Sequence, residues 1–297
     1  MENAVVSEYL ISIKNGQVVT NDLPALIRVE GTTLHFMASK PFTVLLDMEI
    51  DGDLEVTYDI EAQAQVELIE TRKATCESRL IRHIHVGENA KLASLVLNES
   101  EATLEVSDDV KVEANANVES AYAELSLSTI KAKYGYDLVG EGANVEVKMA
   151  ALSSNTDHKS FDISLNHLAR YTYGQMDNYG VVKDQATLIF NGIGKIVKGM
   201  NQSSTHQTSK IIVFDPSTHA EANPYLYIDE YDVKASHAAG VGRMDEEHLF
   251  YMQSRGLTKH QAMRLITYGY LVPVIDVIDN QRVKDAFNEM LEKRMGD

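Results

Sequence analysis

Short alternating runs of apolar and polar residues occupy most of the chain, from about Leu34 to Val241. The stretch GDLEVTYDIEAQAQVELIE is one example, and KDQATLIFNGIGKIVKG continues the same theme. Alternation with a period of two residues is typical of β-strands with one buried face, and the Gly, Asp, Asn and Ser clusters between the runs are typical of turns. The pattern therefore predicts a long all-β region.

The turns between these runs resemble one another, but they do not recur at a constant interval. GENA at Gly87, SDDV at Ser107, GEGA at Gly140 and KDQA at Lys183 each precede a similar alternation of small apolar residues. In a β-solenoid each rung stacks only on its neighbours, so insertions between rungs are tolerated better than in a sandwich. The loose repeat therefore favours a β-helix over a β-sandwich.

Helix signals replace the alternation after Met244. Asp245 can N-cap a helix that ends at Gly256, and Thr258 with Gln261 forms a T-x-x-Q capping box for a second helix. Apolar residues at helical spacing near the end of the sequence indicate a third helix. The last part of the chain is thus expected to be helical.

Length and composition agree with a folded protein of this kind. The chain has 297 residues, of which 44% are hydrophobic and 24% charged, as in ordinary globular proteins. We expect an N-terminal segment (1–33), a β-helix core (34–243) and a small C-terminal helical domain (244–297).

Charge and hydropathy argue against two classes of partner. The net charge of −17 would repel a phosphate backbone, and no basic block counters that repulsion locally, so nucleic acid is not expected. No window reaches the roughly 18 apolar residues that a membrane span requires, and the start MENAVVSEYL lacks a signal-peptide pattern. The expected location is the cytoplasm, without a membrane partner.

Cys76 is the only cysteine of the chain. An intramolecular disulfide and a thiolate-rich metal site within one chain are therefore excluded. A lone cysteine is most often a small buried hydrophobic residue, and this is the expectation for Cys76. Metal chemistry would have to use histidines, carboxylates or a second chain.

Three polar or glycine-rich stretches contain residues of the kinds found in active sites. His83 and His85 would project from one face of a strand and could share a metal, but no third ligand is evident. Asp157 and His158 lie near serines, but without a nucleophile elbow. NGIGKIVKG around Gly192 lacks the Ser or Thr and the first glycine of a P-loop. None of the three predicts catalysis.

The second half of the chain resembles the SufB/SufD family, the scaffold proteins of the Suf iron–sulfur cluster assembly system. The resemblance is most specific in VKASHAAGVGRMDEE around His237 and in the LFYMQSRG that follows, and it begins at about Ala186. The segment SNTDHKSFDISLNHLARYTYG looks like the part of the family core that precedes it. The resemblance implies a right-handed parallel β-helix followed by a helical domain, and a scaffold rather than an enzyme.

The resemblance also implies partners and a site. In the family the helical end docks SufC, an ABC-type ATPase, while the β-helix edge pairs with a second SufB/SufD subunit. The histidine that matches His237 lies near that subunit interface, where a nascent cluster is built, and neutral imidazole is a competent iron ligand. His237 is thus the candidate interface residue and metal ligand. The alternative is a histidine that only hydrogen-bonds within the last rung.

Candidate ATPase contacts lie in the helix that ends in SRG: Phe250, Tyr251, Ser254, Arg255 and Gly256. Phe250 and Tyr251 offer apolar anchor area, and Arg255 offers a directional cation. Gly256 allows the positive φ that leads into the next helix. The alternative for Phe250 is a place in the core of the helical domain.

The chain departs from the family pattern at the cluster ligands. SufB-like members have a cysteine in the strand region before the histidine and a glutamate directly after it, whereas this chain has no cysteine after Cys76 and has Ala238. SufD-like members commonly carry a cysteine two residues before the histidine, where this chain has Ala235. It looks closest to SufD or to short SufB/SufD-type proteins. One chain is not expected to hold a cluster stably, so a transient iron–sulfur cluster would need a subunit interface.

Three functions stay open from the sequence. The first is a scaffold that works with a SufC-like ATPase, and the second is a structural or regulatory partner of that ATPase that does not ligate iron. The third is a carbohydrate-active β-solenoid enzyme, which should show charged residues clustered on one face and a secretory signal; the sequence shows neither. A homodimer, a heterodimer with a SufB-like chain and the client proteins are not distinguished.

Overall fold

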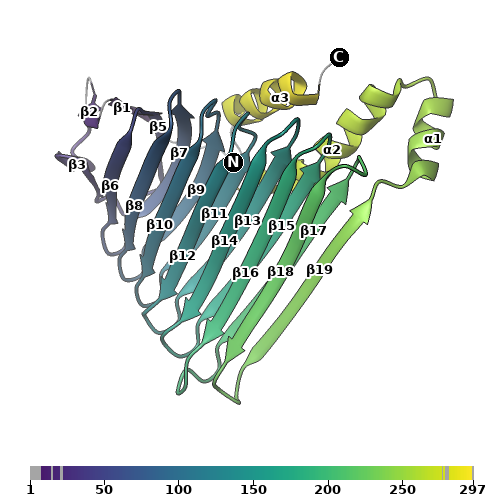
Figure 1. The fold of residues 1–297 in the computed structure, drawn as a ribbon. Coiled ribbons are helices and arrows are strands. Elements are labelled where there is room, and N and C mark those ends of the chain that lie inside the picture. The colour runs from purple at the N-terminus through teal and green to yellow at the C-terminus, as the bar shows by residue number, and fades with distance from the viewer. Residues whose placement is uncertain (1–7, 15, 21–22, 276, 278–280, 296–297) are drawn as a thin grey trace, which may run out of the picture.

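A computed structural model of the chain describes residues 8–14, 16–20, 23–275, 277 and 281–295. Its described part holds strands β1 to β19 followed by helices α1 to α3. The strands form two sheets that face each other along the length of the molecule (Figure 1). Each turn of the coil gives one strand to each sheet, so the fold is a parallel β-solenoid, as the sequence predicted.

Sheet A is ten-stranded and consists of β1, β2 and the odd-numbered strands from β5 onward. Its strands are β1 (Glu8–Lys14), β2 (Gln17–Val19), β5 (Phe42–Ile50), β7 (Gln65–Ala74), β9 (Lys91–Asn98), β11 (Asn117–Glu124), β13 (Asn144–Ser153), β15 (Tyr173–Val182), β17 (Ser204–Val213) and β19 (Lys234–Arg243).

Sheet B is nine-stranded. Its strands are β3 (Ile27–Glu30), β4 (Thr33–Phe36), β6 (Asp53–Ile60), β8 (Ser78–Val86), β10 (Leu104–Val112), β12 (Ile130–Leu138), β14 (His158–His167), β16 (Thr187–Ile196) and β18 (His219–Ile228). Strand β1 already pairs in parallel with β5, so strands of the solenoid begin within the segment 1–33.

The rungs lengthen along the chain, which explains the loose repeat of the sequence. Gln65 pairs with Lys91 and Lys91 with Asn117, two steps of 26 residues. Tyr173 pairs with Ser204, a step of 31 residues. The solenoid accordingly widens from its N-terminal end toward β19 (Figure 1).

Three of the four predicted turns lie between strands, and one does not. Gly87 follows β8, Gly140 follows β12 and Lys183 follows β15. Ser107 lies inside β10, so the turn predicted there is wrong. Polar residues in a row usually indicate a turn. Here Asp108 points into the lumen and binds Arg82, so the strand continues through this polar stretch.

A buried ionic network lies in the lumen of the N-terminal half. Arg82 donates from Nε to Asp108 Oδ1 and from Nη1 to Glu70 Oε2, both at 2.8 Å. Arg72 also donates to Glu70, and Tyr58 donates its hydroxyl to the same carboxylate at 2.9 Å. Burial alone would raise the pKa of Glu70, but the guanidinium groups of Arg82 and Arg72 outweigh it and lower the pKa to about 2. The network therefore keeps a charged carboxylate inside the lumen.

The two expected helix starts are confirmed. Helix α1 (Glu246–Ser254) is capped by Asp245, whose Oδ1 accepts from the backbone N–H of Glu247 at 2.9 Å. Helix α2 (Lys259–Ile275) begins with the reciprocal bonds of the capping box between Thr258 and Gln261. No helix among the described residues is both long and apolar enough to cross a bilayer.

Helices α2 and α3 (Gln281–Met295) cover part of the outer face of sheet A (Figure 1). A second apolar core joins Leu271 and Phe287 from these helices to strand residues such as Leu97 and Leu152. Sheet A therefore has apolar residues on both faces. One set faces the lumen, and the other lies on the outer face beneath the helices.

Candidate subunit interface and docking helix

His237 lies in β19, the last strand of sheet A. On one edge β19 pairs with β17, and its other edge is the end of the sheet. All ten residues of β19 are exposed, because no further rung of the described chain covers them. The candidate residue thus stands at the open C-terminal end of the solenoid.

The register shows that His237 points toward the lumen and not toward the outer face. His237 is paired with Gln207 of β17, which is 3% exposed and belongs to the inward set. The neighbouring Ser236 binds the outward His206, with 2.7 Å between Oγ and Nδ1. Since side chains alternate along a strand, His237 continues the inner column. The structure gives its ring no hydrogen bond among the described residues.

A packed polar layer lies beneath His237. Gln207 crosses the lumen and donates from Nε2 to the backbone oxygen of Tyr225 in β18 at 3.0 Å. A Cβ at Gly194 would approach this Nε2 to 2.7 Å, so the glycine makes room for the amide. The lumen beneath His237 is therefore filled by side chains. The ring of His237 is open on its other side, at the exposed C-terminal end of the solenoid.

The two free edges at this end of the solenoid differ. Pro224 lies in the middle of β18 and removes one backbone donor there, a common feature of edge strands. Strand β19 has no proline, and its sequence KASHAAGVGR keeps every backbone amide. A long edge of small residues without such protection is a template for pairing with another strand.

Exposed apolar side chains lie beside these edges. Tyr225 and Tyr227 are 43% and 56% exposed, and their rings stack with an interplanar angle of 5°. Val241 of β19 is also exposed. Apolar area of this kind next to an open edge is typical of a surface that binds another protein.

Two carboxylates that the sequence places near His237 serve the last turn instead. Glu230 accepts the backbone N–H groups of Gly199 and Tyr231, and these hydrogen bonds lower its pKa. Asp232 accepts from the side chain of Gln202. Asp232 lies in the bend before β19, which begins at Lys234. Both carboxylates are therefore engaged in the turn that precedes the strand of His237.

Cys76 is exposed, so the expectation of a buried cysteine is wrong. It lies in the turn between β7 and β8, beside the polar residues Thr75 and Glu77, and its sulfur is 3.6 Å from Ser78 Oγ. Six strand spacings of sheet A separate β7 from β19, which is about 29 Å. The thiol cannot reach His237 within one chain.

The other histidine and carboxylate pairs have structural partners. His85 Nδ1 lies 2.9 Å from Asp59 Oδ1 on the outer face of sheet B, and His83 lies near Asp109. Asp157 is buried and forms an ion pair with Arg294 of α3 at 3.2 Å. Within the described ranges, no group of three or more His, Cys, Asp or Glu residues could hold a metal ion.

Helix α1 buries none of its residues. Phe250 is 73% and Tyr251 58% exposed, so the alternative that Phe250 belongs to a core is wrong. Arg255 lies over the Tyr251 ring, with Cζ 5.1 Å from the centroid, and Ser254 donates to the Tyr251 backbone oxygen. Gly256 has a φ of 96° and ends the helix.

A mostly apolar groove of about 480 Å³ lies beside α1. It is lined by Ile212, Arg243, Met244, Asp245, His248, Tyr251, Met252 and Ile266. The groove joins the end of the last strand to α1 and α2, so one surface contains Tyr251 and residues of the solenoid. Sequence reasoning missed this groove, because its two sides are brought together only by the return of α2 onto sheet A.

Comparison with known proteins finds one family over most of the chain. The model of the SUF system FeS cluster assembly SufBD core domain matches residues 55–270, well upstream of the resemblance seen in the sequence. SufD of Bacillus subtilis (strain 168) is 36% identical over 54% of this chain, and SufD of Escherichia coli (strain K12) is 23% identical over 53%. A SufBD family protein of Pyrococcus horikoshii is 25% identical over 74% of the chain.

The chain spans only part of these relatives. The matched stretches make up 36%, 37% and 50% of the three proteins, in the order given. The family model nevertheless covers most of the solenoid together with α1 and much of α2. With its parallel β-solenoid followed by helices, the chain belongs to the SufB/SufD family of iron–sulfur cluster assembly proteins.

Proposed function

We propose that the chain is a scaffold subunit of a Suf-type iron–sulfur cluster assembly complex. It would work with a SufC-like ABC ATPase and with a second SufB/SufD-type subunit, and the cluster is its cargo. The observation that carries the proposal is the open end of the solenoid, where the inward-facing His237 lies on an unprotected edge strand. Relatives named iron–sulfur cluster assembly proteins support the same role.

The second subunit would pair with β19 rather than with β18. Strand β19 offers ten residues of free backbone, whereas Pro224 interrupts the edge of β18. A partner that covers this end would enclose His237 in a shared interior. Since this chain has no cysteine near β19, the thiolate ligands that iron–sulfur clusters require would come from that partner.

A substitution at His237 tests the ligand role. We expect His237→Ala, mixed with the ATPase and a cysteine-bearing SufB-like partner, to load a cluster more than about tenfold less than wild type, because one ligand is lost. The control is His206→Ala, which removes an imidazole from the outer face of the neighbouring strand. Anaerobic reconstitution followed by visible absorption and iron and sulfide analysis gives the measurement.

Equal loading by His237→Ala and wild type would contradict the ligand role. The protein would then be better described as an ATPase-associated frame that does not ligate iron, the second function left open by the sequence. If His206→Ala loads a cluster as wild type does while His237→Ala does not, the inward-facing position of His237 is supported as the ligand site.

Binding of the ATPase is proposed for helix α1. Phe250 and Tyr251 expose apolar area, and the stack on Tyr251 orients Arg255 for a directional contact. We expect the double substitution Tyr251→Ala and Arg255→Ala to weaken ATPase binding by at least about tenfold, as for residues that dominate an interface. The melting temperature should not change, since neither side chain is buried.

Calorimetric titration of the purified ATPase gives this affinity. Tyr227→Ala is the matched control, because Tyr227 is as exposed as Tyr251 but lies on β18, away from the helices. Point substitutions are preferable to removing residues 244–297, because α2 and α3 cover apolar residues of sheet A. An affinity equal to wild type in the double variant would remove α1 from the docking surface.

A further inference from the structure

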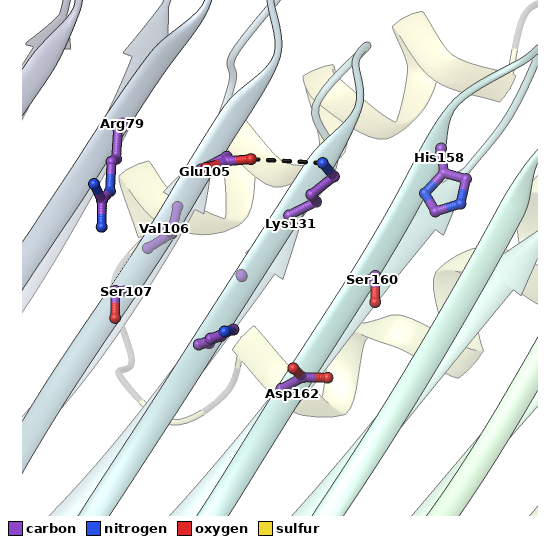
Figure 2. A pocket seen from close by; sticks show the side chains of 10 residues that line it. Arg79, Glu105, Val106, Ser107, Lys131, His158, Ser160 and Asp162 are labelled. Atoms are coloured by element: carbon purple, nitrogen blue, oxygen red, sulfur yellow. Dashed lines mark ion pairs between the residues drawn. The ribbon is translucent and has the colours of Figure 1, made fainter.

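A shallow pocket lies on the outer face of sheet B, away from β19 and α1 (Figure 2). It spans β8, β10, β12 and β14 and has a volume of about 450 Å³. Its titratable residues are Arg79, Glu105, Lys131, Lys133, His158 and Asp162. The sequence indicated no cluster of charged residues on one solenoid face, and this pocket corrects that expectation: residues of four rungs come together only in the folded sheet.

Both carboxylates of the pocket have partners. Glu105 Oε1 lies 3.5 Å from Lys131 Nζ, the pair joined by a dashed line in Figure 2. Asp162 Oδ1 accepts from Asn191 Nδ2 of β16 at 2.7 Å, on the side away from β12. The acidic groups are therefore engaged with other side chains.

Two of the cations have no ion pair in the part of the chain that the structure describes. These are Arg79 of β8 and Lys133 of β12, both exposed. Ser107 is paired with Lys133 in the sheet register, and Ser160 lines the same pocket from β14. The pocket thus combines a guanidinium, an ammonium and two hydroxyl groups as possible donors, while each of its two carboxylates has one partner.

We infer that this pocket binds a small oxyanion with at least two negative oxygens, such as phosphate or a di- or tricarboxylate. A guanidinium holds two oxygens of such an anion at once, and Lys133 adds a compact positive charge from β12, two strands away in the sheet. Serine hydroxyls donate to further oxygens. This inference does not depend on the proposed scaffold function.

Calorimetric titration with inorganic phosphate and with citrate, at constant ionic strength, tests the site. Wild type should bind one or both with a Kd in the millimolar range or below, and the double substitution Arg79→Gln and Lys133→Gln should weaken binding at least about tenfold. The matched control is Lys148→Gln with Lys210→Gln, which changes the net charge equally but lies on sheet A. It should bind as wild type does.

The two anions distinguish the ligand chemistry. Saturable binding of phosphate alone would point to a phosphorylated metabolite, and saturable binding of citrate alone to a polycarboxylate; both support the site. Equal affinities in the site variant and in the sheet A control would overturn it, as would the lack of saturable binding of either anion up to about 10 mM, beyond the millimolar range of weak sites.

Discussion

An Arg82→Met protein should be less stable than wild type by about 3–5 kcal/mol, because the substitution leaves buried carboxylates without their partner. Arg82 is 2% exposed and binds both Glu70 and Asp108 inside the lumen. Methionine fills a similar volume but supplies no charge, so one carboxylate of the network would be uncompensated. Urea unfolding followed by circular dichroism measures the loss.

Arg79→Met is the control for this substitution. Arg79 lies on the same strand, three residues earlier, but on the exposed outer face. Its replacement should change the free energy of unfolding by no more than about 0.5 kcal/mol. If the two variants were equally stable, the lumen network would contribute nothing to the stability of the solenoid.

The same network predicts how stability falls in acid. The pKa of Glu70 is lowered from 4.5 to about 2 in the folded chain, so the unfolded chain binds more protons between these values. The stabilisation is complete above pH 4.5 and is lost as the pH falls toward 2, about 3 kcal/mol in all. In Arg82→Met this acid-dependent loss should be smaller, because part of the field that lowers the pKa is gone.

A second buried group, His167, also makes stability depend on pH, but in a higher pH range than Glu70. Burial lowers the pKa of His167 from 6.5 to about 4. The unfolded chain therefore takes up a proton between pH 6.5 and 4 that the folded chain does not, and stability also falls there as the pH decreases. The comparison of Arg82→Met with wild type consequently belongs below pH 4.

The strands and helix caps could be predicted from the sequence because their signals are local. Alternation marks a strand wherever one face is buried, and Asp245 and Thr258 cap helices through groups two or three residues away. The charged residues of the lumen were not predictable in this way, since the polar run SDDV predicted a turn and not a strand. Asp108 is compatible with a strand only because Arg82 of the adjacent rung faces it, 26 residues away in sequence.

The sequence indicated His237 as a candidate residue, but it did not predict in which direction the side chain points. Whether His237 faces the lumen or the solvent depends on its register with Gln207 of β17, which no local pattern in KASHAAGVGR specifies. A run of small residues has no polar and apolar alternation, so its two faces look alike. The exposure of α1 was not decided by the sequence either, since a core position for Phe250 stayed open until the structure showed all side chains of the helix exposed or half-buried.

Helix α3 contributes a buried cation that local patterns could not reveal. Arg294 is 6% exposed and donates from Nε to the Leu125 backbone oxygen at 2.7 Å. Its other nitrogens bind Ser154 Oγ at 3.1 Å and Asp157 Oδ2 at 3.2 Å. Turns of two adjacent rungs, after β11 and after β13, are therefore joined to the last helix by one side chain.

Replacement of Arg294 by methionine should loosen the attachment of α3 to the solenoid. The buried Asp157 would lose its ion pair, and the expected loss of stability is about 3 kcal/mol or more. The apolar contacts of Phe287 with the strand residues would remain, so the damage should concentrate in the last helix and the turns it touches. Hydrogen–deuterium exchange should rise in α3 and around residues 125 and 154 while the central strands stay protected.

Lys293→Met is the matched control, because Lys293 is adjacent in sequence but exposed, and its ion pair is with Glu289 on the same helix. It should leave both exchange and stability close to wild type. Protection of α3 in Arg294→Met equal to that in Lys293→Met would show that the apolar core alone holds the helix. If α3 instead opens while ATPase binding through α1 is retained, the anchoring and docking parts of the helical domain are separable. The guanidinium of Arg294 would then be the group that fixes the C-terminal helix to the solenoid.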